Sequence, residues 1–246
     1  MSQLTGKVAL VTGGSRGIGA AIARRLAHDG AEVALTYTRS EDKARAVARQ
    51  ITADGGKALV IRADSADPDA VTDAVDRTAR ELGGLDILIN NAGIFTGGPL
   101  DEATVKDLDE IFAIDVRAVF LASQAAARHL PTGGRIITIG SALTERVPAE
   151  GMTLYAMCKA ALSGLTRGLA RDLGPRGINV TLVNGGLIDT DMNPANGPTA
   201  DLFSSITALG RYGTPDELAA TVAHLAGDGG RYITGTAITV DGGFAA

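Results

Sequence analysis

Short runs of β-branched and aliphatic residues alternate with helical patterns along most of the chain. The strand-like runs lie at residues 8–12, 32–37, 57–62, 86–90, 135–140, 178–183 and 237–243. Helical patterns separate them, the later ones near residues 104–130, 153–173 and 215–227. Strands that alternate with helices predict right-handed βαβ crossovers, which place the strands in a parallel sheet covered by helices on both faces.

The alternation extends through all 246 residues without an internal repeat, a low-complexity stretch or a long linker. We therefore expect residues 1–246 to form a single α/β domain of the Rossmann type, with a doubly wound parallel sheet of about seven strands. Residues 187–213 depart from the pattern because they are rich in Asn, Pro, Gly and Thr. Such a segment over a rigid sheet often touches substrate, so we expect it to form a lid.

The composition argues against several classes of function. The net charge of −5 disfavours nucleic acid as a partner, because phosphate binding favours a basic face. The single cysteine, Cys158, excludes an intramolecular disulfide framework, and the three histidines lie far from the motifs below, so we expect no metal site. No stretch reaches the ~18 uncharged apolar residues of a membrane span, and the first residues predict a strand and not a signal peptide. We expect a cytoplasmic protein with no membrane partner.

A glycine-rich turn, TGGSRGIG at residues 12–19, joins the first predicted strand to the first predicted helix. A helix amino terminus offers free N–H groups and partial positive charge, which suit a pyrophosphate. Gly13, Gly17 and Gly19 remove side chains where the backbone must approach that group. A plain tight turn is the alternative, but the position between strand and helix favours a dinucleotide site.

The end of the second predicted strand indicates which dinucleotide is bound. NAD sites place an acid there to bind the ribose 2′-hydroxyl, whereas residues 35–40 read LTYTRS with no acid before Glu41. Arg39 can pair with a 2′-phosphate, and Arg16 of the glycine turn can reach the same group. Two solvated arginines are the alternative, but the missing carboxylate favours NADPH over NADH.

Three residues have the chemistry of a proton-transfer site. Ser141 follows the predicted strand 135–140, and Tyr155 and Lys159 share one face at the start of the predicted helix 153–173. An ammonium stabilises a neighbouring phenolate, so Tyr155 can act as a proton donor. The Ser141 hydroxyl can hold a substrate oxygen as negative charge builds on it. Tyr and Lys at this spacing are often only an exposed pair, but Ser141 at a strand's carboxyl end favours catalysis.

Over essentially its whole length the chain resembles the classical short-chain dehydrogenase/reductase family, and within it the 3-oxoacyl-carrier-protein reductase-like branch. The matching pieces are, in order, residues 12–19, Asp64, the NNAG of residues 90–93, Ser141, Tyr155 with Lys159, and the DGG of residues 241–243. The resemblance implies an NADP(H)-dependent ketoreductase or alcohol dehydrogenase in which Tyr155 donates the proton. It also implies a homotetramer with long helices and the last strand at the interfaces.

The resemblance also implies a set of residues around the cofactor. Asp64 and Ser65 should lie by the adenine, Lys159 should bind the nicotinamide ribose, and Ile188 and Thr190 should contact the carboxamide. The full expected set is Gly13, Ser15, Arg16, Gly17, Ile18, Gly19, Tyr37, Arg39, Asp64, Ser65, Asn91, Ala92, Gly93, Tyr155, Lys159, Gly186, Ile188 and Thr190.

The sequence departs from the family at two positions. Asp115 stands where the family commonly has the Asn of a catalytic tetrad, and we expect it to keep the carbonyl that serves the proton relay and to raise the pKa of Lys159. Gly185, in the run Asn184-Gly185-Gly186, replaces the family's Pro, and we expect it to loosen the entrance to the lid.

An apolar substrate pocket is predicted from the lid and from the loop after Ser141. Its residues are Leu143, Met152, Leu187, Met192, Leu202 and Phe203. Such a lining favours a hydrophobic free ketone or a 3-oxoacyl thioester over a sugar. An acidic acyl carrier protein is a possible partner if basic residues such as Arg128, Arg135 and Arg176 line the entrance.

A second hypothesis is a binding protein. Residues 189–198, DTDMNPANGP, resemble a subgroup that includes a bacterial cyclic-dinucleotide-binding, biofilm-dispersal protein. In that interpretation the fold senses a nucleotide with little catalysis. The intact Ser141, Tyr155 and Lys159 favour the enzyme, because a pure sensor does not need them.

Overall fold

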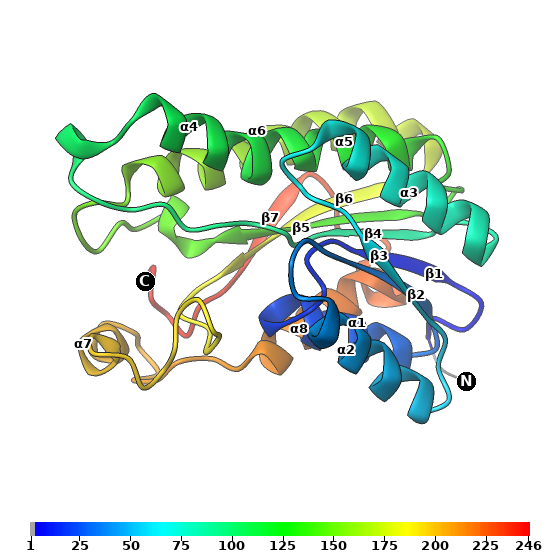
Figure 1. The fold of residues 1–246 in the computed structure, drawn as a ribbon, viewed down its shortest axis with the longest axis horizontal. Helices are drawn as coiled ribbons and strands as arrows, with labels where there is room; N and C mark the ends of the chain where they lie inside the picture. The colour runs from blue at the N-terminus through cyan, green and yellow to red at the C-terminus, as the bar shows by residue number, and fades with distance from the viewer. Residues whose placement is uncertain (1–2) are drawn as a thin grey trace.

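Residues 3–246, the part of the chain that the computed structural model describes, form one seven-stranded sheet in the order β3-β2-β1-β4-β5-β6-β7 (Figure 1). Every pair of neighbouring strands is parallel, as the alternation predicts. The strands are β1 (Val8–Val11), β2 (Glu32–Tyr37), β3 (Ala58–Arg62), β4 (Ile87–Asn90), β5 (Arg135–Ser141), β6 (Asn179–Gly185) and β7 (Thr236–Val240). The carboxyl ends of all strands therefore meet at one edge, where sites in open α/β sheets lie.

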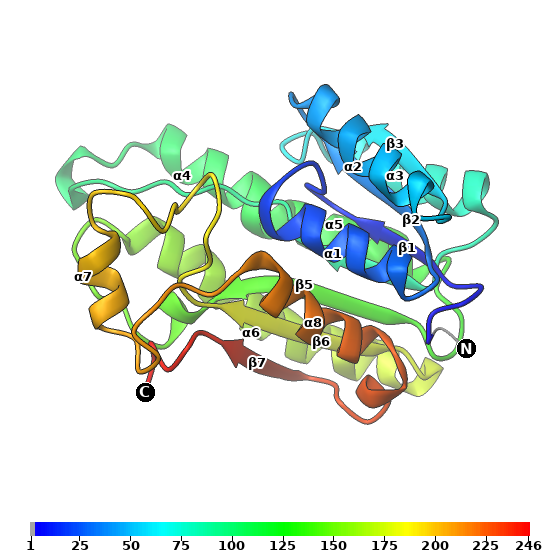
Figure 2. The same ribbon diagram turned by 90° about the horizontal axis from the view of Figure 1, so that it is seen from below.

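Helices cover both faces of the sheet. One face carries α3 (Pro68–Leu82), α4 (Val105–Phe112), α5 (Ala118–Ala127) and α6 (Thr153–Leu173), and the other carries α1 (Gly17–His28), α2 (Glu41–Ala53) and α8 (Pro215–Ala226) (Figures 1 and 2). None of the helices within residues 3–246 is long and apolar enough to cross a membrane.

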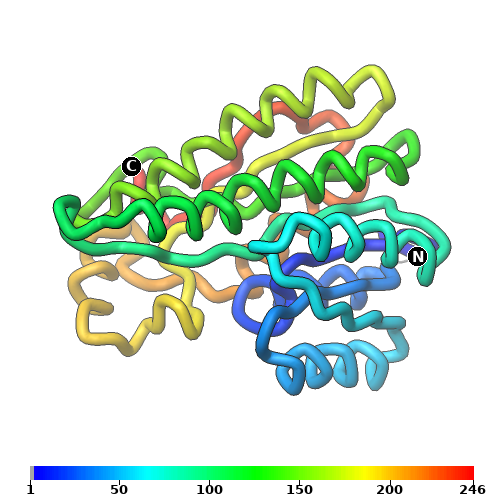
Figure 3. The backbone as a smooth tube through the Cα atoms, turned by 45° about the horizontal axis from the view of Figure 1, so that its top comes forward, coloured from blue at the N-terminus to red at the C-terminus, as the bar shows by residue number. Residues whose placement is uncertain are grey.

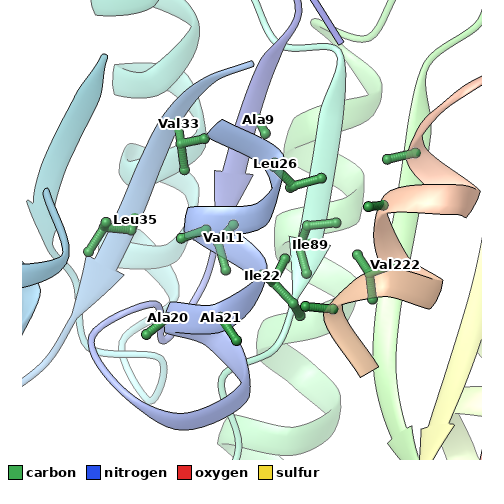
Figure 4. Close-up of a cluster of buried hydrophobic side chains, with 14 of the residues drawn as sticks. Ala9, Val11, Ala20, Ala21, Ile22, Leu26, Val33, Leu35, Ile89 and Val222 are labelled. Atoms are coloured by element: carbon green, nitrogen blue, oxygen red, sulfur yellow. The ribbon is translucent and has the colours of Figure 1, made fainter. Parts of the chain in front are cut away.

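The core beneath α1 is built from small and branched side chains. Ala20, Ala21, Ile22 and Leu26 of α1 point toward β1, β2 and β4, and Val222 of α8 closes the cluster (Figure 4). Each fully buried branched side chain contributes roughly 1.5–3 kcal/mol relative to an exposed one. The alanines let α1 lie close to the sheet, which fixes its amino terminus at the carboxyl end of β1.

The predicted helix 104–130 is interrupted by a π-helical turn. Helices α4 and α5 run end to end as one rod (Figure 3), but residues Ala113–Arg117 between them adopt the wider π conformation. Single π turns inside α-helices are rare and frequently occur at functional sites. Asp115 lies in this turn and is buried, so the irregularity falls at a residue that the sequence predicts for the proton relay.

The predicted lid, residues 187–213, lies past the carboxyl ends of β5 and β6 and contains the short helix α7 (Ala200–Ser205) (Figures 1 and 2). The expected loose entrance at Gly185 is wrong. Gly185 is the last residue of β6 and pairs with Ser141 on one side and Val240 on the other. A β-carbon on Gly186 would lie 2.5 Å from the Cα of Asp241, so close packing accounts for that glycine.

The last strand is also shorter than predicted. Residues 237–243 were expected to be extended, but β7 ends at Val240 and the next residues turn. Gly242 and Gly243 have φ angles of 64° and 78°, which favour glycine. The Asp241 carboxylate accepts hydrogen bonds from the N–H groups of Gly243 and Ala245 and closes this turn.

Candidate active site

The glycine-rich turn is shaped for an anionic group. Gly13 and Gly17 have positive φ angles, and a β-carbon on Gly19 would overlap the carbonyl of Gly13. Gly13 N–H donates to the Thr36 hydroxyl at 2.9 Å, which anchors the turn to β2. Among residues 3–246, no side chain caps the start of α1 after Arg16. Its free N–H groups therefore fit the pyrophosphate of a dinucleotide.

The loop after β4 is tied to the glycine turn through Thr12. The Thr12 hydroxyl accepts from the N–H groups of Asn91 and Ala92 at 2.9 and 3.0 Å. The Asn91 amide donates to the carbonyls of Thr12 and Gly13 at 2.9 and 3.2 Å. The predicted residues Asn91 and Ala92 thus brace the turn. This role of Thr12 was not predicted from the sequence, although its place directly before the first glycine was a usable signal.

The end of β2 lacks a free acid. Glu41, the first carboxylate after β2, is held by Arg45 of the same helix at 2.7 Å. Burial, and then Glu41, raise the pKa of Tyr37, which lies inside the fold. Arg39 is exposed at the strand's end. After the neighbouring strand β3, Asp64 accepts from Ala66 N–H at 3.0 Å and shapes the loop that also carries Ser65.

Asp115 and Lys159 form a buried ion pair. The Asp115 Oδ2 and Lys159 Nζ atoms are 2.8 Å apart, and the two side chains are 0% and 7% exposed. The other carboxylate oxygen accepts from Ile94 N–H at 2.9 Å. A β-carbon on Gly93 would lie 3.1 Å from both charged atoms. The glycine therefore makes room for the pair, which joins the loop after β4, the π turn and α6.

The groups around Lys159 act on its pKa in opposite directions. Burial alone would lower the pKa of Lys159, but the nearby charges of Tyr155 and Asp115 outweigh it and raise that pKa. The expected effect of Asp115 on the lysine is therefore confirmed in direction. The Lys159 Nζ lies 5.4 Å from the centroid of the Tyr155 ring. A cation at this position stabilises a phenolate.

Tyr155, in the first turn of α6, has an aromatic neighbour that the sequence analysis missed. The Phe95 and Tyr155 ring centroids are 5.2 Å apart with the rings inclined at 56°. Phe95 is 48% exposed, so one side of this ring pair faces outward. The residue carries no motif, because it lies in an irregular loop and meets Tyr155 only through the fold. Phe95 is a candidate contact for an apolar substrate.

Ser141 lies at the carboxyl end of β5 as predicted. Its hydroxyl accepts from Leu143 N–H at 3.2 Å, which leaves its own proton free to be donated. Helix α6 packs against the turn of residues Ala142–Thr144 that follows it. Ser141, Tyr155 and Lys159 therefore belong to neighbouring elements at one sheet edge.

The lid contacts the glycine turn directly. A β-carbon on Gly17 would lie 3.3 Å from the Thr190 Cγ2, and Ile188 pairs with Gly213 in a short bridge below it. Thr190 thus lies beside the glycine-rich turn, and its predicted contact with the cofactor stays a prediction. Met192 and Leu202 are more than half exposed, whereas Leu143, Met152, Leu187 and Phe203 are partly buried.

The three arginines considered for an acidic carrier lie elsewhere. Arg135 is buried at the amino end of β5, where it donates to the carbonyls of Leu225 and Gly227 at the carboxyl end of α8. Arg128, between α5 and β5, pairs with Asp76. Arg176, before β6, donates to the Leu130 carbonyl. All three belong to the amino-terminal side of their strands, opposite the site, so they do not line its entrance.

Comparisons with known proteins match nearly the whole chain to members of one family. The family model described as enoyl-(acyl carrier protein) reductase matches residues 13–245. The chain is 49% identical over 246 residues to the cyclic-di-GMP-binding biofilm dispersal mediator protein of Escherichia coli K12, with 100% of both chains covered. It is 39% identical over 256 residues to a versicolorin reductase of Emericella nidulans, with 98% of this chain and 96% of the relative covered.

A solved structure is also similar to this chain over nearly its whole length. A short-chain dehydrogenase from Burkholderia cenocepacia J2315, in complex with NADP, is 60% identical and superposes with a TM-score of 0.98. The superposition covers 99% of this chain and 100% of the other.

Proposed function

The chain belongs to the short-chain dehydrogenase/reductase family, and on that premise we propose that it is a carbonyl reductase that converts a ketone to an alcohol. Its cofactor is NADP(H), as in the Burkholderia relative. The observation that carries the proposal is the Lys159–Asp115 ion pair beside the ring of Tyr155, next to the predicted cofactor turn. A nucleotide sensor has no need of a buried cation against a phenol.

The residues present fit NADPH. The start of α1 would hold the pyrophosphate, Arg39 and Arg16 would hold the 2′-phosphate, and Ile188 and Thr190 would hold the nicotinamide end. NADPH, when bound, supplies the hydride for the carbonyl carbon. Ser141 donates a hydrogen bond to the carbonyl oxygen, where negative charge builds. Tyr155 then gives that oxygen its proton, and Lys159 stabilises the phenolate left behind. The relay past Asp115 stays a prediction.

The arginine at the end of β2 provides a test of the cofactor contacts. Replacing Arg39 with Ala should raise the Kd for NADPH about tenfold, because a charge-assisted contact to the 2′-phosphate is lost. The Kd for NADH should change less than about twofold. Titration of cofactor fluorescence measures both. Arg49→Ala on α2, also exposed, is the matched control. An equal weakening of both cofactors would contradict the assignment.

The proposed substrate is a hydrophobic free ketone. Phe95, Met192 and Leu202 expose apolar surface around the site, whereas the arginines considered for an acidic carrier lie at the opposite edge. We therefore favour the free ketone over a carrier-bound 3-oxoacyl thioester as the substrate. A homotetramer is proposed from the family resemblance, and a cytoplasmic location is proposed from the sequence.

An NADPH oxidation assay tests the function and the substrate class together. The panel contains an aryl ketone, a 3-oxoacyl thioester, an enoyl thioester and a keto sugar. We expect the highest kcat/KM with the aryl ketone. Highest activity with the enoyl thioester would replace the proposed reaction by reduction of a carbon–carbon double bond. No turnover with any member would remove the proposal.

Cyclic-dinucleotide binding is the second candidate, favoured by the identity to the Escherichia coli biofilm protein. A calorimetric titration with cyclic di-GMP, in the presence and absence of NADPH, addresses it. Tight binding together with no turnover across the panel would place this function first.

A further inference from the structure

Asp191 of the lid bridges two cations that belong to the cofactor-binding elements. Its Oδ2 atom lies 2.8 Å from the Nζ of Lys43 and 3.5 Å from an Nη atom of Arg16. Lys43 lies in the first turn of α2, and Arg16 directly precedes α1. The lid, the glycine turn and α2 are thus joined at one carboxylate.

The two cations flank the end of the cofactor site that would receive a 2′-phosphate. Arg16 belongs to the glycine turn, and Lys43 lies four residues after Arg39, in the first turn of α2. Both line a cavity of about 400 Å³, in which Arg24 is a third cation and Asp216 a carboxylate. A phosphate monoester is the ligand class that such clustered cations bind.

We propose that Asp191 occupies the place of the cofactor's 2′-phosphate in the free protein and acts as a latch that this phosphate releases. The phosphate carries more negative charge than one carboxylate and can draw Arg16 and Lys43 away. Asp191 then loses its partners and the lid segment loses its tether to α1 and α2. NADH lacks the phosphate and leaves the bridge in place.

The ion pairs of Asp191 are weak enough to be broken when the cofactor binds. All three side chains are about half exposed, and exposed ion pairs contribute little individually. Lys43, and then Arg16, lower the pKa of Asp191, so the carboxylate is charged at neutral pH. The inference rests on NADP(H) as the cofactor and is independent of which ketone is reduced.

Cofactor binding without substrate provides the test. Asp191→Asn should lower the Kd for NADPH about three- to tenfold at low salt, leave the Kd for NADH within about twofold, and lose the difference at high salt. Asp201→Asn on α7 removes the same charge from an exposed lid position and should change neither constant. An unchanged Kd for NADPH, an increased one, or equal changes for both cofactors would overturn the latch.

Hydrogen exchange of residues 187–213 gives a second readout that needs no activity. Adenosine 2′,5′-bisphosphate should speed exchange in the natural protein, whereas ADP, which lacks the 2′-phosphate, should not. Asp191→Asn should exchange fast from the start. Protection of the segment by the bisphosphate would mean that Asp191 straps the lid over the cofactor, which contradicts a released latch. Because no ketone is present, this failure leaves the proposed reaction untouched.

Discussion

Replacing Tyr155 with Phe should lower kcat for ketone reduction about 10³-fold or more, because the substrate oxygen loses its proton donor. The substitution removes one oxygen and keeps the ring. The contact with Phe95 and the position of the Lys159 ammonium over the ring do not depend on the hydroxyl. We therefore expect the Kd for NADPH to stay within about twofold of the natural value. Steady-state kinetics and a cofactor titration measure the two quantities.

A matched control separates loss of the proton donor from loss of a tyrosine. Tyr232 is fully exposed, and Tyr232→Phe deletes the same atom at the surface. This variant should keep its kcat. Retained turnover in Tyr155→Phe would remove Tyr155 as the proton donor. A large rise in the Kd for NADPH would instead assign Tyr155 to cofactor binding.

The motifs predicted the candidate site because each of them lies within a short stretch of the chain. The glycine turn and the Tyr155–Lys159 pair depend on local spacing, and the sheet follows from strand and helix periods. The structure adds contacts that no local pattern encodes. The Phe95–Tyr155 contact joins residues of different elements, and the Lys43–Asp191 bridge spans 148 positions. Only folding brings such pairs together.

One wrong expectation and one missed feature have a common physical origin. Gly185 was read as a source of freedom because an isolated glycine widens the range of φ. In the fold it is a strand residue between Ser141 and Val240, and both partners hold it in register. The helical pattern near residues 104–130 did not predict the π turn, because an apolar period does not report one. Tertiary context decides both cases.

Removing the carboxylate of Asp115 should lower the free energy of unfolding by about 3–5 kcal/mol, because it leaves the Lys159 ammonium buried without its partner. Asp115→Ala tests this by urea denaturation at neutral pH and one protein concentration. Asp109→Ala, on the exposed side of α4, removes a carboxylate from the same helical rod and should cost less than about 0.5 kcal/mol.

The pKa of Lys159 also predicts how the free energy of unfolding changes with pH. In the natural protein the folded pKa of Lys159 is raised above its unfolded value of about 10.4. Its contribution to stability is therefore complete below about pH 10 and is lost as pH rises through the folded pKa. In Asp115→Ala the attraction between the carboxylate and the Lys159 ammonium is gone, so burial lowers the pKa of Lys159 with less opposition. The pKa of Lys159 should fall, so less stability is lost on going to alkaline pH.

Asp115→Asn separates charge from hydrogen bonding. The amide oxygen can still accept from Ile94 N–H, and Asn is the residue that the family commonly has, so turnover should stay within about tenfold. The stability should lie between those of the natural protein and Asp115→Ala, since an amide satisfies a buried ammonium less well than a carboxylate does. A large fall in turnover would show that the reaction needs the negative charge itself. Equal stability of all three proteins would mean that the buried ion pair contributes nothing to folding.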